Sequence, residues 1–413
     1  MIKGRLIVSI ASSWDYDPTS KHHLMRILSR HNDVLWINYH GSRRPEINGR
    51  DLKGTCSALA RVSHGIRRAT SSIFQLTPLV LPGATNPLLQ RLHQRMLIAQ
   101  IRRGIRIVSG GREKPVQVWS FAPDVPYLVG PFDEECFIYY CVDEYTQFEG
   151  FDSRRIAAAE NEMIDRADVV VTTSEPLLIT KRARRHDTVL VRHGVDYDHF
   201  AAAWWSSLPR PADLAAIPRP IFGFFGLLHH WVDCALLAKV ARLRPLYSFV
   251  LIGDCKVGVG ELERLDNVFL LGRRPYEDLP AYCAAFDAGM LLFARNAMTR
   301  NVNPVKMYEY LAAGLPIVST PLPEAERYEG PIIIADTAER FAQACDRVLA
   351  TQHSGDREAI SRLVENETWA SKVEYLSDII VARANRALPT VSKPRQDVVP
   401  TGRTEREIAA ATC

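Results

Sequence analysis

Lys306 and Glu309 carry the charges from which the chemistry of this sequence can first be argued. They lie three residues apart, so on a helix they share one face. Pro304 suits the first position of that helix, which makes Asn303 the predicted N-cap. A helix N-terminus presents free N–H groups and partial positive charge, and a lysine in the first turn adds to it. The segment predicts a diphosphate site beside a carboxylate for sugar hydroxyls, although a surface helix with an ion pair would show the same spacing.

Asp143 is the residue that we predict to act as a general base. It follows the apolar run 136–141, which reads as a buried strand, and Glu144 beside it is the reserve choice. A base must take the proton of an attacking hydroxyl, and burial raises the pKa of a carboxyl toward the value that this task needs. A turn carboxylate at a strand end would have the same position in the sequence.

A second polar group follows the first apolar run, 5–10. Asp15 comes after that run, and His22 and His23 open the next helical segment. Ligands of open α/β sheets bind at the carboxyl ends of the strands, so these three side chains are predicted to bind an acceptor. The alternative is that Ser20 caps the helix and that the histidines are ordinary surface residues.

Short apolar runs alternate with helical segments along the whole chain, which predicts an α/β fold with a doubly wound sheet in each half. Proline-rich residues 206–220 separate the halves and predict a semi-rigid linker. The predicted strands are 5–10, 34–39, 116–120, 136–141, 168–173, 188–192, 221–226, 248–252, 267–271, 287–293, 316–319 and 331–334, and the predicted helices are 20–31, 153–166, 232–244, 277–285, 304–313, 337–351 and 370–383.

The segment 303–318, which runs from Asn303 through Gly314-Leu315-Pro316 into an apolar strand, resembles the donor-binding signature of GT-B glycosyltransferases. The resemblance is to the group related to family 4, with bacterial polysaccharide and teichuronic-acid glycosyltransferases nearest in type. It implies two Rossmann-like domains facing across a cleft. The domains would be 1–205 for the acceptor and 221–355 for the donor, joined by hinge 206–220 and followed by closing helix 356–384 and a disordered tail, 385–413.

The same resemblance implies roles for single residues. Lys306 would hold the donor diphosphate and Glu309 the ribose hydroxyls, and Asn303 would belong to the same donor site. Asn301 occupies the position of a second glutamate in classical family-4 enzymes, and an amide cannot stabilise a developing positive charge. Gly226 follows an apolar run where backbone can approach a phosphate, and the loop with Arg273 and Arg274 would replace cations that relatives carry after that glycine.

Charge is unevenly spread. Residues 1–114 contain 19 Lys and Arg against 6 Asp and Glu, so the rest of a chain with net charge +4 carries about −9. Segment 86–103 has helical spacing with arginines between apolar residues. A basic amphipathic helix can lie on an anionic membrane, and it can equally be a core-facing helix with a solvated arginine face. No apolar run approaches a membrane span, and the eight cysteines form no C-x-x-C pair, which is typical of reduced thiols.

These observations predict an enzyme that moves a sugar from a nucleotide-diphosphate sugar to an acceptor hydroxyl. The expected acceptor is a saccharide or lipid-linked saccharide in polysaccharide biosynthesis, on the cytoplasmic side of the membrane. No D-x-D-like carboxylate pair is flanked by a predicted strand, and Lys306 with the helix dipole can neutralise a leaving diphosphate, so neither a metal nor another cofactor is expected. Three alternatives stay open: a GT-B nucleotide-sugar epimerase, a nucleic-acid-binding protein that uses the basic first quarter, and an inactive sugar-binding scaffold.

Overall fold

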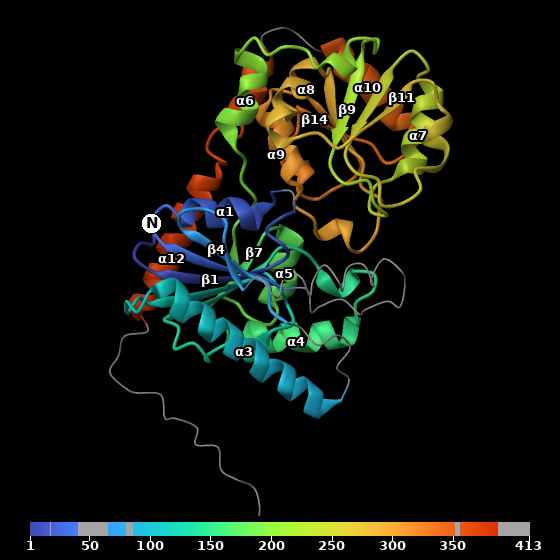
Figure 1. Cartoon of the computed structure of the whole chain (residues 1–413). Coiled ribbons are helices and arrows are strands. Elements are labelled where there is room, and N and C mark those ends of the chain that lie inside the picture. The colour runs from blue at the N-terminus through green and yellow to red at the C-terminus, as the bar shows by residue number, and fades with distance from the viewer. Residues whose placement is uncertain (17, 40–64, 80–85, 352–355, 387–413) are drawn as a thin grey trace, which may run out of the picture.

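Two sheets, stacked one above the other in Figure 1, form the framework of the protein. The computed structural model describes residues 1–16, 18–39, 65–79, 86–351 and 356–386. The first sheet has eight strands in the order β3-β4-β2-β1-β5-β6-β7-β8, and the second has six in the order β11-β10-β9-β12-β13-β14. All neighbours are parallel except β3 and β4. The predicted doubly wound α/β fold in each half is confirmed.

The strands lie close to their predicted ranges, and only β3 and β4 were not predicted. Their bounds are β1 (Leu6–Ala11), β2 (Asp33–Asn38), β3 (Ile66–Arg68), β4 (Ile73–Leu76), β5 (Val116–Ser120), β6 (Cys136–Cys141), β7 (Val169–Thr172), β8 (Val189–Leu190), β9 (Ile221–Phe225), β10 (Ser248–Ile252), β11 (Val268–Gly272), β12 (Ala288–Leu291), β13 (Ile317–Ser319) and β14 (Ile332–Ile334).

Helices cover both faces of the first sheet. Alternate residues of β1 face opposite sides: Leu6 and Val8 pack toward α3 (Pro87–Ser109), α4 (Ser153–Arg166) and α5 (Glu175–Arg182), whereas Ile7 packs toward α1 (Ser20–Leu28) and α12 (Trp369–Arg386). A strand with apolar residues on both faces needs such two-sided cover. The sheet is therefore a buried layer, and its functional side chains must lie at the ends of its strands.

The second sheet is covered in the same way. On one face lie α6 (Tyr197–Trp205), α8 (Leu279–Ala285), α9 (Val305–Ala312) and α11 (Asp356–Arg362), and on the other α7 (Cys234–Leu243) and α10 (Ala338–Thr351). Phe200 of α6 is fully buried in this second core. Helix α6 thus packs on the second sheet, although the predicted boundary at residue 205 assigned it to the first domain.

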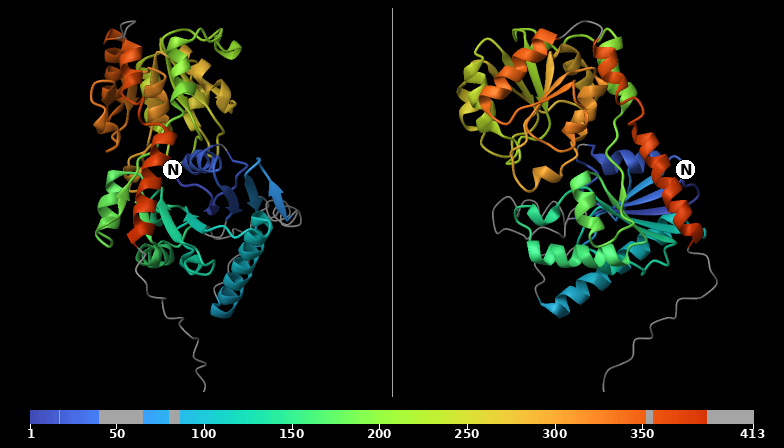
Figure 2. Two further views of the ribbon diagram at one scale, coloured as in Figure 1. Left: turned by 90° about the vertical axis from the view of Figure 1, so that its left-hand side faces the viewer. Right: turned by 180° about the vertical axis from the view of Figure 1, so that it is seen from behind.

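Helix α12 returns the chain to the first domain, as the view from behind in Figure 2 shows. Val373, Leu376 and Ile380 pack with α1 and the first sheet, and the backbone N–H of Ile2 donates to Ser377 Oγ at 3.2 Å. Of the tail predicted from residue 385, only 385 and 386 are described, and they belong to α12. None of the described helices is long and apolar enough to cross a membrane.

The carboxyl ends of the two sheets face each other. Asn303, beyond β12, donates from Nδ2 to the carbonyl oxygen of Thr173, beyond β7, at 2.7 Å. His230, beyond β9, lies 3.9 Å from a carboxylate oxygen of Glu149, beyond β6. Loops that follow strands of both domains therefore meet at one interface, where open α/β sheets place their ligands.

Candidate functional site

Helix α9 carries the charged pair that the sequence singled out. Its residues fold as a helix between Pro304, whose backbone is extended, and Gly314, whose φ of +70° ends it in the left-handed region. The N–H groups of Gly314 and Leu315 bond back to Leu311 and Tyr310 at 2.8 and 2.9 Å, which closes the last turn. The predicted end of the helix at Gly314 is confirmed.

The predicted N-cap is wrong by one residue. Pro304 takes the cap position, and Asn303 makes no side-chain cap bond. The Asn303 amide instead donates to Thr173 of the first domain, and its side chain is almost fully buried. A buried amide must find partners, and this one finds its partner across the domain interface rather than at the helix end. Asn303 thus fixes the start of α9 against the other domain.

Lys306 lies half-buried at the N-terminal end of α9. Its ammonium nitrogen is 4.1 Å from the ring centroid of Phe224 and 5.6 Å from that of Phe293. Removal from water lowers the pKa of Lys306 to about 8, and the nearby Glu309 carboxylate only partly opposes this. Among the described residues the ammonium has no hydrogen-bonded partner ion and lies against two aromatic rings, which suits a cation that binds an anionic ligand.

Gly226 is the residue that makes room for this ammonium. Its φ is +130°, and an ideal Cβ there would lie 2.7 Å from Lys306 Nζ. An ideal Cβ on Gly253 would meet the Gly226 carbonyl oxygen at 2.0 Å. Two glycines therefore let backbone and ammonium approach closely, and the predicted approach of the Gly226 backbone to a phosphate stays a prediction.

Glu309 is buried on the same helix, with 7% of its surface exposed. Burial raises the pKa of Glu309 to about 8, with Lys306 opposing the rise and Asp196 adding to it. The hydroxyl of Tyr276, whose pKa Glu309 also helps to raise, is buried and has no hydrogen-bond partner among the described residues. A carboxyl group and a phenol so arranged can bind hydroxyl groups of a ligand.

Arg273 and Arg274 do not behave alike. Arg274 donates from Nε and from a terminal nitrogen to Asp213 at 3.0 and 2.8 Å, and from Nε to Tyr282 at 3.0 Å. Its guanidinium therefore holds the linker, and we correct its assignment to the donor site. Arg273 is exposed beyond the end of β11, where Gly272 has a φ of +70°. Its assignment stays a prediction.

Asp143 lies at the carboxyl end of β6 in the first domain and is half-buried. Burial raises the pKa of Asp143 to about 7, and the charge of Lys21 on α1 partly opposes this rise. Burial also lowers the pKa of Lys21 to about 8. A carboxylate with such a pKa is suited to proton transfer near neutral pH. Lys21 was not predicted, although a lysine in the first turn opposes the helix dipole and was a signal.

Glu144, the second candidate for the base, is already bonded to other side chains. Its carboxylate accepts from Lys181 Nζ at 3.0 Å and from Thr146 Oγ1 at 2.6 Å. Burial alone would raise the pKa of Glu144, but these partners outweigh burial and lower it. An ionised carboxylate held by a buried lysine is a poor proton acceptor, so Asp143 remains the better choice.

The three predicted acceptor residues have different surroundings. Asp15 is exposed and paired with Arg67 at 2.6 Å. His22 is buried in a capping box, where its Nδ1 accepts from the Thr19 N–H at 3.1 Å, and its ring stacks on Trp36 with centroids 4.8 Å apart. Burial lowers the pKa of His22 to about 3, so it is neutral. The assignment of His22 to acceptor binding, and of Ser20 to the cap, is corrected.

His23 lies where three parts of the chain meet. Its ring stacks on Trp369 of α12 at 5.0 Å, and it lies 6.0 Å from the ring of Tyr276 in the second domain. His193 packs on Trp369 from the loop after β8, at 5.8 Å. Burial lowers the pKa of His23 to about 4 and that of His193 to about 3. Both are neutral rings that fix α12 at the domain interface.

Glu324 is a residue of the domain interface that sequence reasoning missed. It lies beyond β13, is 1% exposed, and accepts from the Glu175 N–H at 2.7 Å and from Arg192 Nε at 2.7 Å. Both donors belong to the first domain. The only signal in the sequence was an acid after a strand, and the donors lie 149 and 132 residues away along the chain.

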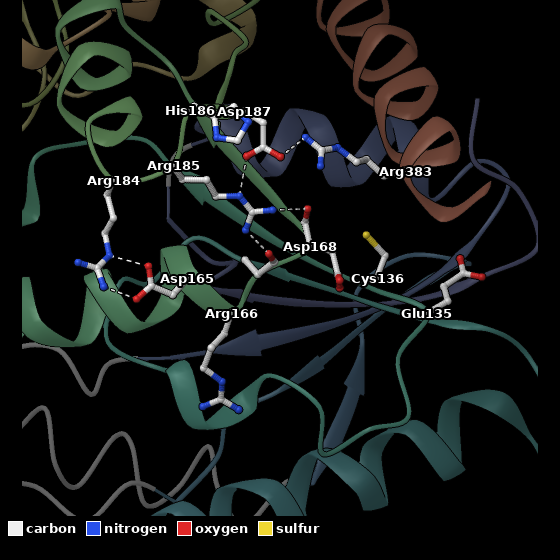
Figure 3. Close-up of a pocket in the computed structure, with 11 residues that line it drawn as sticks. Glu135, Cys136, Asp165, Arg166, Asp168, Arg184, Arg185, His186, Asp187 and Arg383 are labelled. Carbon is white, nitrogen blue, oxygen red and sulfur yellow. Dashed lines mark hydrogen bonds and ion pairs between the residues drawn. The ribbon is translucent and has the colours of Figure 1, made fainter. Parts of the chain in front are cut away.

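A cavity of about 670 Å³ lies elsewhere, at the end of the first sheet where β6 begins with Cys136 (Figure 3). Its arginines are paired with carboxylates: Arg184 with Asp165, Arg166 with Glu162, and Arg185 and Arg383 both with Asp187. It opens at the amino ends of the strands, away from the interface of the two sheets. We do not assign it to either substrate.

Comparisons with known proteins point to one class of enzyme. Residues 219–351 match the family described as glycosyl transferases group 1. Over 275 residues the chain is 26% identical to TuaH of Bacillus subtilis (strain 168), whose name provisionally assigns it to glycosyl transfer in teichuronic acid biosynthesis; the match covers 61% of this chain and 68% of TuaH. These relatives do not favour an epimerase or a nucleic-acid-binding protein.

Solved structures show the same fold. HepE of Anabaena in complex with UDP-glucose superposes with a TM-score of 0.64 at 14% identity, over 91% of this chain and 99% of HepE. Sucrose-phosphate synthase from Thermosynechococcus elongatus gives 0.63 at 13% identity, over 93% of this chain and 100% of the synthase. These are GT-B structures, so the predicted GT-B architecture is confirmed.

Proposed function

We propose that this chain, which is a GT-B glycosyltransferase of the bacterial polysaccharide type, transfers a hexosyl group from a UDP-sugar to a hydroxyl of a lipid-linked saccharide. One observation carries the proposal. The N-terminal end of α9 places Lys306 beside Gly226 of its own domain, and Asn303, just before it, bonds to Thr173 of the other. A cation at a helix N-terminus between two domains is suited to a diphosphate.

The donor is proposed to be a UDP-sugar because HepE, of like fold, binds UDP-glucose. A thermal-shift comparison of UDP-, GDP- and CMP-sugars tests this. A ligand that binds only the folded form raises the melting temperature by mass action. We expect UDP-sugars to give the largest shift in wild type and none in Lys306→Met. Lys239→Met, which changes an exposed lysine of α7, is the control and should keep the shift. Equal shifts in all three proteins would remove Lys306 from the site.

The proposed reaction is attack of an acceptor hydroxyl on the anomeric carbon of the donor. The new carbon–oxygen bond forms as the bond to the UDP oxygen breaks, and the hydroxyl proton passes to the Asp143 carboxylate. Lys306 and the free N–H groups of α9 stabilise the charge on the departing diphosphate. We propose that no metal is needed, so transfer by EDTA-treated enzyme should be unchanged. Loss of transfer with EDTA that added Mg²⁺ restores would contradict this.

The role of Asp143 is tested by the pH dependence of kcat/KM. Only the ionised carboxylate accepts a proton, so kcat/KM should rise with pH until it levels off above about 7, the pKa of Asp143. Asp143→Asn should lower kcat by about 100-fold or more, the usual worth of a general base, and leave the UDP-sugar shift intact. Nearly full activity of Asp143→Asn would show that another group takes the proton. Hydrolysis of the donor by the wild-type protein would show that the chain is an enzyme and not an inactive sugar-binding scaffold.

Helix α3 supports the proposal that the acceptor is linked to lipid. Its middle is anchored by buried Leu97 and Ile101, whereas Leu88, Leu89 and Leu92 near its N-terminal end are 73%, 48% and 50% exposed. Exposed arginines, Arg91 and Arg95, lie between and beyond these leucines. Apolar side chains next to cations are suited to an anionic membrane surface. The enzyme would then act on the cytoplasmic face of the membrane, as a peripheral protein.

Co-sedimentation with vesicles tests this surface. Wild type should bind vesicles that contain phosphatidylglycerol and not pure phosphatidylcholine vesicles, because the arginines need anionic lipid. Replacing Leu88, Leu89 and Leu92 by serine should abolish binding without loss of transfer to a soluble acceptor. Leu246→Ser, which changes an 84% exposed leucine of the second domain, is the control. Binding that persists in the triple variant would exclude α3 as the membrane contact.

A further inference from the structure

Helix α5 is held at its N-terminal end by the second domain. Ser174, its N-cap, donates from Oγ to the carbonyl oxygen of Asn301 at 2.6 Å, and Glu324 accepts from the Glu175 N–H at 2.7 Å. The neighbouring bond from Asn303 to Thr173 completes the set. Asn301 and Asn303 directly precede α9, so this end of α5 is tied to the segment that carries Lys306.

The other end of α5 is held by two carboxylates. Lys181 is 4% exposed, and its ammonium donates to Glu144 at 3.0 Å and to Glu160 of α4 at 2.8 Å. Tyr139 of β6 donates from its hydroxyl to Glu160 at 2.6 Å. Every member of this buried network has a hydrogen-bonded partner, so the network is rigid.

Glu144 joins this network to the proposed base. It is the residue that follows Asp143, and its carboxylate also accepts from Thr146 in the same loop. The loop from 141 to 147 therefore has its middle fixed by Lys181. Buried ion pairs are strongly directional when every remaining oxygen is hydrogen-bonded, and removing one partner leaves an uncompensated charge that the loop must move to solvate.

From this geometry we infer that Lys181 is a positioning residue for sugar transfer. It fixes the Asp143 loop on α5, whose opposite end is fixed on the donor segment, so that one short helix sets the spacing between the base and the bound donor. Reacting atoms must be aligned within fractions of an ångström, so a relaxed loop costs turnover rather than donor binding. The inference rests on the proposed role of Asp143.

A double-mutant cycle between Lys181 and Asp143 tests the inference. Lys181→Met should lower kcat about 10- to 100-fold and leave the melting shift caused by a UDP-sugar unchanged. If Lys181 acts through Asp143, the Lys181→Met/Asp143→Asn protein will be no slower than Asp143→Asn alone. Lys181→Arg, which keeps the charge, should recover part of the lost kcat. Losses that multiply in the double variant, or wild-type kcat in Lys181→Met, would overturn the inference.

Two further results keep the test decisive. If Lys181→Met does not fold, Glu160→Gln replaces it in the cycle, because the glutamine oxygen can still accept from Tyr139 while its NH2 group, a donor, takes the place of the oxygen that accepts from Lys181. A smaller loss of kcat that again does not multiply with Asp143→Asn would support the inference, and a multiplying loss would overturn it. Full activity of the single variant Asp143→Asn would instead refute the proposed role of Asp143, whatever the Lys181 variants show.

Discussion

Two lysine–glutamate groups in the described part of the structure behave in opposite ways. At the proposed donor site the pKa values of Lys306 and Glu309 move toward each other, both to about 8, because burial dominates. In the first domain, burial also opposes charge on Lys181, yet its direct carboxylate partners raise its pKa, and the pKa of Glu144 is lowered. Direct hydrogen bonds therefore stabilise the charged forms of Lys181 and Glu144. In the described structure no such bond joins Lys306 to Glu309, which leaves both side chains available to bind groups of a ligand.

The largest expected difference between the Lys181 and Lys306 groups is in the free energy of unfolding. Lys181→Met should destabilise the folded protein by about 3–5 kcal/mol, because it leaves buried carboxylates without their counter-ion. Urea denaturation of both proteins measures the difference. A change below about 1 kcal/mol would mean that the network is not fixed as the structure shows.

Lys306→Met should affect activity and not stability. Removing a charge that stabilises the leaving diphosphate should lower kcat about 100- to 1000-fold. The folded protein should be no less stable, because methionine packs on Phe224 and Phe293 without burying a charge. Steady-state kinetics and urea denaturation together decide this. Destabilisation by several kcal/mol with a modest loss of activity would mean that Lys306, like Lys181, mainly stabilises the folded protein.

Glu309→Gln should stabilise the protein in a pH-dependent way. The folded pKa of about 8 lies above the ordinary 4.5, so the folded state holds the Glu309 proton more tightly than the unfolded chain. Wild type therefore loses stability as pH rises from about 4.5 to 8, and glutamine removes that loss. At pH 8 the variant should be more stable by about 1 kcal/mol or more, with no difference at pH 4. Equal melting curves at both values would contradict the raised pKa.

The smallest effect is expected at Asp15. Its pair with Arg67 is exposed, and exposed pairs contribute about 0–1 kcal/mol, so Asp15→Asn should leave stability nearly unchanged. If Asp15 binds acceptor hydroxyls, KM for the acceptor should rise several-fold at constant kcat. Unchanged acceptor kinetics would remove Asp15 from the acceptor site.

Local patterns predicted the fold and helix α9, whereas contacts between distant residues could not be predicted. The run from Asn303 to Pro316 carries its helix, its end and its following strand within one short segment. The partners of Asn303, Arg274 and His22 lie 130, 61 and 14 residues away, and a single sequence does not state these pairings. That is why Asn303 was predicted as a cap, Arg274 as a donor ligand and His22 as an acceptor ligand.

The return of α12 to the first sheet has a consequence for dissecting the enzyme. One face of the N-terminal unit, including Trp36 and Leu24, is completed by side chains from the far end of the chain, Val373, Leu376 and Ile380. A fragment cut at residue 205 would expose that apolar face and aggregate. A circular permutant that begins near residue 366 and joins α12 to the segment before Ile2 would keep the unit whole, because Ser377 already bonds to the Ile2 backbone.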